Sequence, residues 1–363
     1  MLTTVAGGVA AAALAPLRAK ADGALVRVRA PLVPVIADEA WAIRTVVGLR
    51  PFRRNGFALY ATRLGGKRVV HNYGHGGGGI TLSWGCATLA ADLLNDVATR
   101  NAAVLGCGVL GLSTARILQE RGFDVTIYAD AMPPNTTSNI AGGQWAPTAV
   151  FRADDVTPAF MTVFQRAAKI AYQRFQLMAG TRYGVRWIDN YDLTTQPDQK
   201  GQYATEQAEG VALFADVAQI DPASTPFTAP YVRRFASMLI EPNTYLPALL
   251  EDFFIAGGRV RIRRFSHVSE VVALPHDSIV NCTGLGSHEL FGDQDIYPIR
   301  GQLTILEPQP DVNYIIVAPN LSYMFPRSDG IVVGGTFDAH DWSLEPNPQT
   351  VHEKLAALRA LYR

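Results

Sequence analysis

The chain lacks a net charge, a cysteine framework and any repeated unit. Its 363 residues include 32 Lys and Arg against 32 Asp and Glu, so no overall field attracts nucleic acid or an anionic membrane surface. Cys86, Cys107 and Cys282 are its three cysteines, and their spacing forms neither a disulfide framework nor a metal site. We therefore expect a small-molecule partner, with no nucleic acid, no membrane and no metal.

The first residues differ in kind from the rest of the chain. The run LTTVAGGVAAAALAPL, followed by RAKA, has an apolar core and small residues suited to cleavage after Ala21. It is too short and too rich in glycine to span a membrane. No basic residue precedes Leu2. The sequence favours a truncated export signal over residues 1–21 and an exported or periplasmic location; the alternative is a loose alanine-rich helix on a cytoplasmic protein.

A dinucleotide fingerprint begins at Ala102. AAVLGCGVLGLSTARILQERGFDVTIYAD predicts a strand, a glycine turn, a helix and a second strand. Gly106, Gly108 and Gly111 form G-x-G-x-x-G, in which the first glycine makes a tight turn, the second admits a pyrophosphate and the third lets helix and strand pack. Asp130 stands where an acid accepts a ribose hydroxyl. The alternative is a glycine-rich turn that binds no ligand.

A second glycine-rich segment, HNYGHGGGGITLSWGCA over residues 71–87, precedes this fingerprint. Glycine loses more backbone entropy on folding than other residues, so this run indicates positive φ angles or close approach to a ligand. His71 and His75 are interpreted as hydrogen-bonded structural residues of the loop and not as proton carriers.

The later segments predict a return to the first sheet and then a second layer. SIVNCTGLGS, from Ser278, predicts a short buried strand whose polar turn puts Thr283 and Gly284 near the nucleotide. IRGQLTILEP and SYMFPRSDGIVVGGTF predict strands of an antiparallel layer.

Together these motifs resemble the D-amino-acid oxidase family of flavoproteins. The resemblance rests on LGCGVLGLSTA, TSNIAGGQWAP, VNCTG, and HNYGHGGGGITLSWGCA with GLRPFR upstream. It covers residues 34–363 and implies an α/β fold: a Rossmann-type FAD-binding domain and a second, mainly antiparallel substrate domain. The implied FAD-binding parts are residues 66–150 and 258–290, and the implied substrate-binding parts are residues 38–65, 151–257 and 291–363.

The motif order departs from the family, in which the fingerprint opens the chain and the HNYGHGG segment lies near its end. The order here predicts a circular permutation, with residues 95–102 as the new join. Permutation requires only that the old termini lie close together and that the new ones lie in an exposed connection. We expect residues 71–87 to lie beside the turn at residues 106–111.

The resemblance also implies site residues. Arg50 would pair with the substrate carboxylate through both arms of its guanidinium, Tyr323 would donate its hydroxyl to the same group, and the Gly77 carbonyl would accept from the amine. Trp145 would stand near the flavin ring. The full set implied for FAD is Gly76, Gly79, Ile80, Thr81, Gly106, Gly108, Val109, Leu110, Gly111, Asp130, Thr136, Thr137, Ser138, Gly143, Gln144, Trp145, Phe265, Thr283 and Gly284.

The implied activity is oxidation of D-amino acids by hydride transfer to FAD, with oxygen as acceptor, hydrogen peroxide as product, no catalytic acid or base, and a homodimer as a possible assembly. Arg53 and Arg327 are interpreted as structural, which leaves no second cation for an acidic substrate side chain. Three alternatives stay open: a flavin oxidase of glycine or sarcosine, a nicotinamide-dependent dehydrogenase, and a cofactor-free binding relative.

Overall fold

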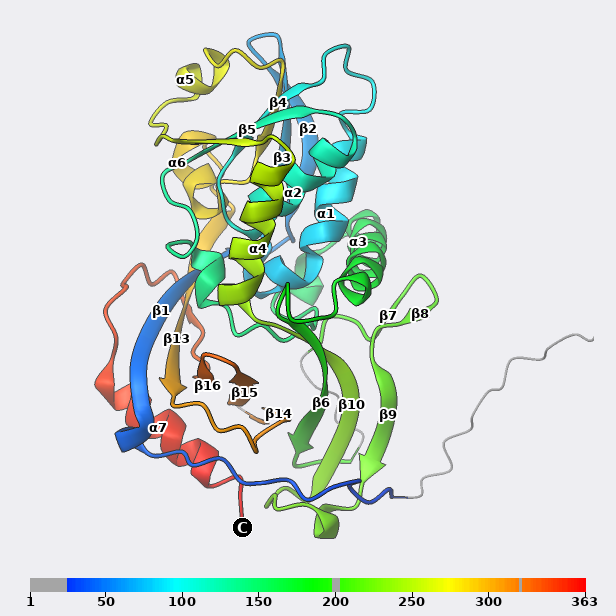
Figure 1. Ribbon diagram of the computed structural model, residues 1–363, viewed down its shortest axis with the longest axis vertical. Helices are drawn as coiled ribbons and strands as arrows, with labels where there is room; N and C mark the ends of the chain where they lie inside the picture. Colours follow the sequence, from blue (N-terminus) through cyan, green and yellow to red (C-terminus); the bar gives the residue numbers. More distant parts are fainter. Residues whose placement is uncertain (1–24, 198–202, 320–321) are drawn as a thin grey trace, which may run out of the picture.

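The computed structural model describes residues 25–197, 203–319 and 322–363, and the export signal expected over residues 1–21 lies outside them. Two large sheets dominate this part of the chain (Figure 1). A six-stranded sheet with its helices forms one half, and a nine-stranded sheet forms the other. This mixed α/β architecture with a second, mainly antiparallel layer confirms the predicted fold class.

The six-stranded sheet has the order β11-β5-β4-β12-β3-β2. Its strands are β2 (Ala58–Leu64), β3 (Lys67–Tyr73), β4 (Asn101–Leu105), β5 (Asp124–Ala129), β11 (Arg259–Ile262) and β12 (Ser278–Asn281). All neighbours pair in parallel except β2, which is antiparallel to β3. A parallel sheet is covered on both faces, which explains the continuous apolar runs in β4 and β12.

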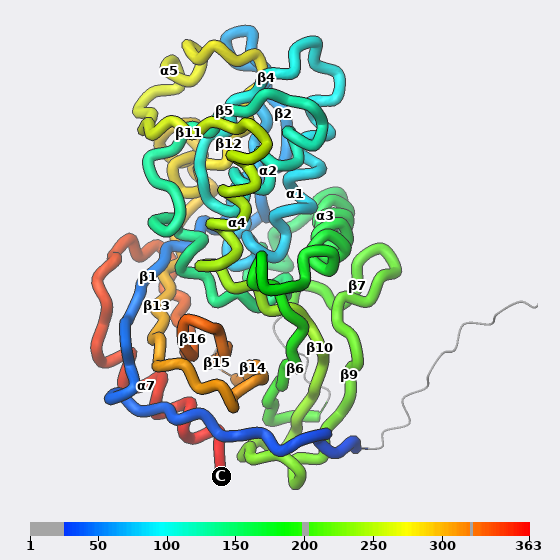
Figure 2. Tube along the Cα trace, viewed as in Figure 1, coloured from blue at the N-terminus to red at the C-terminus, as the bar shows by residue number. Residues whose placement is uncertain are grey.

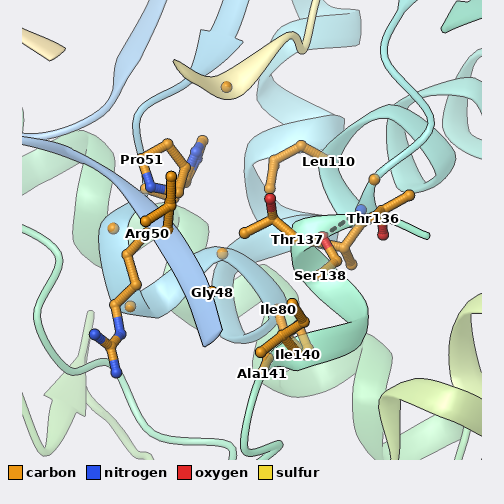
Figure 3. Close-up of a pocket in the computed structure, with 18 of the residues that line it drawn as sticks. Gly48, Arg50, Pro51, Ile80, Leu110, Thr136, Thr137, Ser138, Ile140 and Ala141 are labelled. Carbon is orange, nitrogen blue, oxygen red and sulfur yellow. Dashed lines mark hydrogen bonds between the residues drawn. The ribbon is translucent and has the colours of Figure 1, made fainter. Parts of the chain in front are cut away.

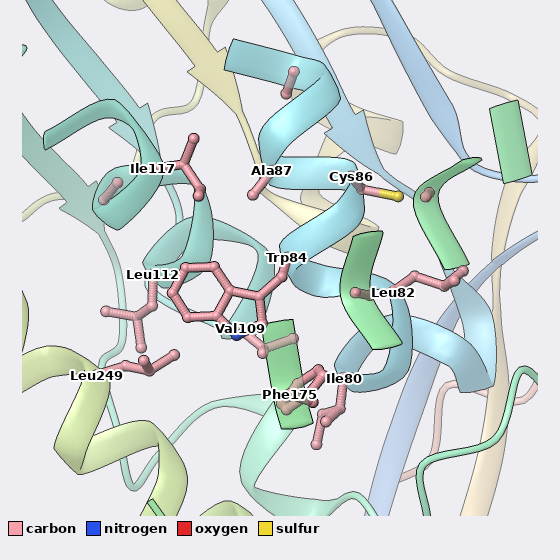
Figure 4. Close-up of a cluster of buried hydrophobic side chains, with 14 of the residues drawn as sticks. Ile80, Leu82, Trp84, Cys86, Ala87, Val109, Leu112, Ile117, Phe175 and Leu249 are labelled. Atoms are coloured by element: carbon pink, nitrogen blue, oxygen red, sulfur yellow. The ribbon is translucent and has the colours of Figure 1, made fainter. Parts of the chain in front are cut away.

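Helices cover both faces of this sheet. α1 (Gly79–Asp92), α2 (Val109–Glu120), α3 (Pro158–Leu177) and α4 (Pro242–Ile255) share one core, part of which Figure 4 shows around Trp84. The short helices α5 (Val268–Val272) and α6 (Ser287–Leu290) contribute Val271 and Leu290 to the core of the opposite face.

The nine-stranded sheet has the order β1-β13-β16-β15-β14-β6-β10-β9, with β17 paired to β13. Its strands are β1 (Ala42–Arg53), β6 (Val185–Thr194), β9 (Ala215–Ile220), β10 (Tyr231–Ile240), β13 (Ile296–Leu306), β14 (Ile315–Val317), β15 (Tyr323–Arg327), β16 (Gly330–Gly334) and β17 (Asp338–Ala339). Every pair is antiparallel except β14 with β6. Helix α7 (Pro348–Arg359) covers its outer face through Leu355 and Leu358.

The remaining elements are short. A hairpin joins β7 (Gln207–Ala208) and β8 (Val211–Ala212), and the 3-10 helices are η1 (Glu39–Trp41), η2 (Gly76–Gly78), η3 (Thr137–Ile140), η4 (Ala153–Asp155), η5 (Pro222–Ser224) and η6 (Gly284–Gly286).

The division between the two halves differs from the predicted one. Strand β2 was expected in the substrate part, yet it pairs with β3 because a two-glycine turn, Gly65 and Gly66, folds it back as a hairpin. Helices α3 and α4 fall within the range 151–257 but pack their apolar sides on the six-stranded sheet's helices. Strand and helix patterns identify buried faces without identifying which sheet covers them.

Segments in unexpected sequence order lie side by side. Strand β12 pairs with β3 on one side and with β4 on the other. Asn72 donates its side-chain amide to Thr114 Oγ1 on α2 at 3.0 Å. This confirms that residues 71–87 lie beside the turn at residues 106–111.

The segment that leads into β1 runs along the C-terminal helix, as the blue and red ends of the tube show in Figure 2. Tyr314 donates its hydroxyl to the Val33 carbonyl at 2.7 Å and lies 3.0 Å from the Tyr362 hydroxyl. Arg359 donates to the Ala37 carbonyl at 2.6 Å. The C-terminus therefore packs against the residues that precede β1.

Candidate functional site

A cavity of about 880 Å³ lies where the carboxyl ends of the parallel strands meet the inner face of the nine-stranded sheet. Ligands of open α/β sheets bind at this edge, and the volume is in the range of small-molecule and cofactor sites. Figure 3 shows Arg50 on strand β1 at one side of the cavity and residues 136–138 at the other.

The fingerprint turn forms one wall. Gly106 has a φ of +103°, and a Cβ added there would lie 2.5 Å from the Cys282 carbonyl oxygen. Helix α2 begins at Val109 with no acidic side chain in its first turn, and the Val109 amide donates to Ser138 Oγ at 3.0 Å. A helix N-terminus that opens into a cavity favours a phosphate. Asp130 and Phe265 also line this end, so the residues present fit a dinucleotide cofactor.

Close packing within the protein, besides a ligand, accounts for part of the glycine run at residues 76–79. A Cβ at Gly76 would lie 2.3 Å from the Ala149 carbonyl oxygen, and a Cβ at Gly77 would lie 3.1 Å from the Thr148 carbonyl oxygen. Gly79, in contrast, has ordinary packing distances and faces Leu110 and Val109. The close approach of residues 148–149 therefore requires glycine at position 76 and favours it at position 77. The sequence pattern alone does not reveal this approach.

Both histidines of this segment are held neutral. Burial lowers the pKa of His71 to about 4, and its ring nitrogens lie 3.2 Å from Thr62 Oγ1 and from Asn281 Nδ2. His75 stacks on Phe57 with ring centroids 4.6 Å apart, and burial lowers its pKa to about 3. Neither is poised to carry a proton at neutral pH.

Arg50 lies at the opposite wall of the cavity from the fingerprint. Its guanidinium occupies the space over Gly301, where an added Cβ would lie 2.4 Å from Nη1. Nη1 donates to the Thr336 carbonyl at 3.0 Å, and the guanidinium carbon lies 4.2 Å from the Phe337 ring centroid. Among the described residues no carboxylate pairs with Arg50. A guanidinium with no acid beside it in a cavity is suited to bind an anionic ligand.

Two other arginines near the site are neutralised. Arg53 pairs with Asp293 at 3.0 Å and with Asp295 at 3.1 Å. Arg327 pairs with Asp329 at 2.7 Å and donates to the Ala141 carbonyl at 2.9 Å. Their contacts agree with the structural interpretation of both side chains.

Tyr323 lies beside Arg50. Its ring covers Gly334 and Gly335, where an added Cβ would approach within 2.5 Å and 2.7 Å. It stacks on Phe325 with centroids 4.5 Å apart. Burial raises the pKa of the Tyr323 hydroxyl and the Arg50 charge lowers it, with burial the larger effect. The hydroxyl therefore stays protonated and can donate a hydrogen bond.

The cavity brings together most of the predicted site residues. Those that line it are Arg50, Tyr323, Gly76, Gly77, Gly79, Ile80, Thr81, Gly106, Gly108, Val109, Leu110, Asp130, Thr136, Thr137, Ser138, Gly143, Gln144, Phe265, Thr283 and Gly284. Gly111 and Trp145 do not line it.

These two predicted contacts with the cofactor need correction. Gly111 serves packing alone, because an added Cβ would lie 2.0 Å from the Gly106 carbonyl oxygen. Trp145 is 0% exposed and lies in the core, with its ring 5.1 Å from that of Tyr172. Residues 144 and 145 point to opposite sides of an extended segment that pairs with β10, so Gln144 faces the cavity and Trp145 does not.

Sequence reasoning missed a buried polar cluster at the far end of the cavity. Tyr203 donates its hydroxyl to Asp192 Oδ1 at 2.6 Å, and Arg233 bridges Asp192 at 3.3 Å and Glu206 at 2.8 Å. Burial, the largest effect, raises the pKa of Asp192 to about 6. A signal was present: Asn190, Asp192 and Thr194 alternate along β6, as side chains on one face of a strand do.

Two features are absent from the part of the chain that the structure describes. None of their helices is both long and apolar enough to cross a membrane. No group of three or more His, Cys, Asp and Glu side chains among them is placed to hold a metal ion.

Comparison with known proteins gives the same family by two routes. The family model DAO, described as FAD dependent oxidoreductase, matches residues 5–93 and 101–363. A D-amino-acid oxidase of Streptomyces coelicolor is 32% identical over 273 residues, covering 73% of this chain and 80% of the relative. The human D-aspartate oxidase is 30% identical over 273 residues, covering 72% of this chain and 76% of the relative.

Solved structures show the same fold at lower identity. A glycine oxidase from Geobacillus kaustophilus superposes with a TM-score of 0.55 at 14% identity, covering 73% of this chain and 79% of that chain. A glycine oxidase from Bacillus cereus gives a TM-score of 0.52 at 18% identity, covering 72% of this chain and 79% of that chain.

Proposed function

This chain belongs to the FAD-dependent oxidoreductase family, and from that premise we propose that it oxidises D-amino acids. The observation that carries the proposal is Arg50, a guanidinium without a carboxylate partner among the described residues, beside the Tyr323 hydroxyl in the cavity that also contains the fingerprint turn. Relatives named as D-amino-acid oxidases support this substrate class.

The residues of the chain bind and orient the substrate. Arg50 offers two parallel N–H donors to the carboxylate, Tyr323 adds an O–H donor, and the Gly77 carbonyl accepts from the amine. These contacts fix the Cα–H bond in one direction, and alignment of this kind contributes up to roughly 7 to 11 kcal/mol to a reaction. Bound FAD would supply the acceptor for the Cα hydride, and oxygen would be the final acceptor of the electrons.

FAD would lie along the fingerprint wall. Gly106 and Gly108 leave room for the pyrophosphate, the amide groups at the start of α2 face its charge, and Asp130 accepts a ribose hydroxyl. Backbone groups of Gly79, Ile80 and Thr81 would hold the flavin ring. Hydride transfer from an amino acid with a neutral amine needs no side chain as an acid or base, and burial, which lowers the pKa of His75 to about 3, makes His75 a poor proton acceptor.

The chain order is part of the proposal: we infer a circular permutation of the family's order. The support is that the family model matches in two blocks separated by residues 94–100. In addition, Arg359 and Tyr314 tie the C-terminal region to residues 33–37, where the family's chain would run on without a break.

The test is the visible spectrum of the purified protein. We expect flavin absorbance that bleaches under anaerobic D-alanine and returns with oxygen and hydrogen peroxide. L-Alanine, glycine and sarcosine serve as comparisons. Bleaching by glycine or sarcosine alone would replace the proposal with the neighbouring oxidase class, and a colourless protein that reduces a nicotinamide would replace it with a dehydrogenase.

A further inference from the structure

The cavity extends beyond Arg50 and Tyr323 along the inner face of the nine-stranded sheet. In the register of β15, β14 and β6, Tyr323 pairs with Val317 and Val317 pairs with Asp192. Directly paired residues project on the same face of a sheet. All three line the cavity, so a row of side chains runs from the carboxylate-binding end, past an apolar residue, to an acid.

The length of this row suits a long substrate side chain. Two strand spacings separate Tyr323 from Asp192, which is about 10 Å between backbones. The side chains of Tyr323 and Asp192 reach into this span from both ends. The remaining gap is on the scale of an unbranched chain of three or four methylenes, with bonds of about 1.5 Å.

The acid at the end of the row keeps an excess of negative charge. Asp192 and Glu206 share the single guanidinium of Arg233, and the contact with Glu206 is the shorter one, 2.8 Å against 3.3 Å. The neighbouring Arg234 is paired with Asp216. Among the described residues, these two carboxylates and one cation leave about one negative charge, in a place where the Asp192 side chain is only 2% exposed.

Asp192 also has acceptor capacity left. A carboxylate offers about four lone-pair sites, and the described contacts use one from Tyr203 and one from Arg233. Tyr203 and Gln144 add polar atoms to the same end of the cavity. An amine or guanidinium that arrives there meets acceptors and a charge of opposite sign.

We propose that Asp192 is a specificity-determining residue that selects D-amino acids whose side chain ends in a cation, such as D-ornithine, D-lysine or D-arginine. This rests on the proposed function of the same site. Acidic side chains meet like charge at Asp192, and Arg53 and Arg327, already paired with acids, provide no cation for them. The chain thereby differs in preference from an oxidase of D-aspartate.

The kinetic test compares isosteric pairs of substrates. In D-norleucine a methyl group replaces the terminal amine of D-ornithine. We expect kcat/KM for D-ornithine to exceed that for D-norleucine at least tenfold in the unaltered protein. Asp192→Asn should bring the ratio down to about one while D-norleucine oxidation continues. Asp189→Asn, on the opposite face of the same strand, is the matched control and should keep the ratio.

A binding test does not depend on turnover. 5-Aminopentanoate and hexanoate lack the α-amine but keep the same difference at the chain end. Calorimetric titration of the flavin-loaded protein should give at least tenfold tighter binding of 5-aminopentanoate, and this difference should disappear in Asp192→Asn. Tyr203→Phe, which leaves the carboxylate and frees one of its acceptor sites, is the control and should preserve the difference. If Asp192→Asn does not fold, equal binding of the two ligands by the unaltered protein still overturns the selection of cations.

The outcomes separate the two proposals. Equal kcat/KM values for D-ornithine and D-norleucine, or a ratio that Asp192→Asn does not change, overturn the selection of cations while leaving the oxidase intact. Absence of oxidation of any D-amino acid overturns the oxidase and this inference together. A preference for D-glutamate or D-aspartate over D-ornithine also overturns the selection of cations, while leaving the oxidase intact.

Discussion

Arg50 is the residue on which we expect substrate binding to depend most. Arg50→Ala should raise KM and lower kcat with the flavin spectrum intact, because both the anchor and the alignment are lost. A charge-assisted pair in a water-poor pocket contributes on the order of 2–4 kcal/mol, which corresponds to about a 30- to 1000-fold loss of kcat/KM. Steady-state kinetics with a D-amino acid measure this.

Arg53→Ala is the matched control for Arg50→Ala. Arg53 holds Asp293 and Asp295 and does not line the cavity, so its loss should lower stability and change kcat/KM much less. If Arg53→Ala abolished activity and Arg50→Ala did not, the assignment of Arg50, Tyr323 and Gly77 to the substrate would be wrong.

Asp130 should affect cofactor retention and not substrate choice. It lies at the end of β5 and lines the cavity, where its carboxylate can accept a ribose hydroxyl. Asp130→Ala should lose FAD faster on dialysis while keeping the same order of preference among D-amino acids. The flavin-to-protein absorbance ratio before and after dialysis checks it, and an unchanged ratio would count against the assignment.

The lowered pKa of His71 predicts that the stability of the folded protein depends on pH. Its pKa in the folded protein is about 4, below the ordinary value of about 6.5, so the unfolded chain binds the proton more readily. The free energy of unfolding should therefore fall as the pH is lowered from about 6.5 towards 4, by at most about 1.4 kcal/mol per pH unit from this residue. Urea midpoints across this range, compared with His71→Asn, measure it. The variant should show the shallower dependence.

At the scale of elements, helices α1 and α3 approach closely at Gly85. An added Cβ there would lie 1.9 Å from the Ala167 carbonyl oxygen, a backbone atom that cannot rotate away. Gly85→Ala should force the helices apart and lower the free energy of unfolding by about 1–3 kcal/mol or more. Denaturant unfolding checks this, with Thr88→Ala in the same helix as the control expected to change it by less than about 1 kcal/mol. Equal midpoints for both variants would show that α3 can move without loss.

At the scale of the whole molecule, the unusual motif order should be dispensable. A rearranged chain of residues 101–363, a short Gly/Ser linker and residues 31–98 restores the order of the family. It should fold, bind FAD and oxidise the same D-amino acids, because every sheet pair in Figure 1 remains available and surface linkers are tolerated. Flavin absorbance and thermal unfolding measure this, and an insoluble or colourless product would contradict the inferred permutation.

The sequence by itself determined the local chemistry. The spacing of Gly106, Gly108 and Gly111, followed by Asp130, identified a strand, turn and helix built for a dinucleotide, since turn geometry and helix starts depend on nearby residues. The role of Arg50 came instead from the resemblance of GLRPFR to a family motif, and it stays a prediction. The buried strand around Val280 could also be predicted, because apolar runs of that length record burial on two sides.

Only the tertiary structure decided which side chains share one cavity. Gln144 and Trp145 are adjacent in sequence, yet one faces the cavity and the other the core, since the pairing with β10 sets the direction of each. Asp192 and Tyr203 meet through strand register and a loop, and Gly76 meets Ala149 across more than seventy residues. Such contacts depend on how the sheets and helices pack against one another, and that packing is a property of the whole chain and not of any short segment.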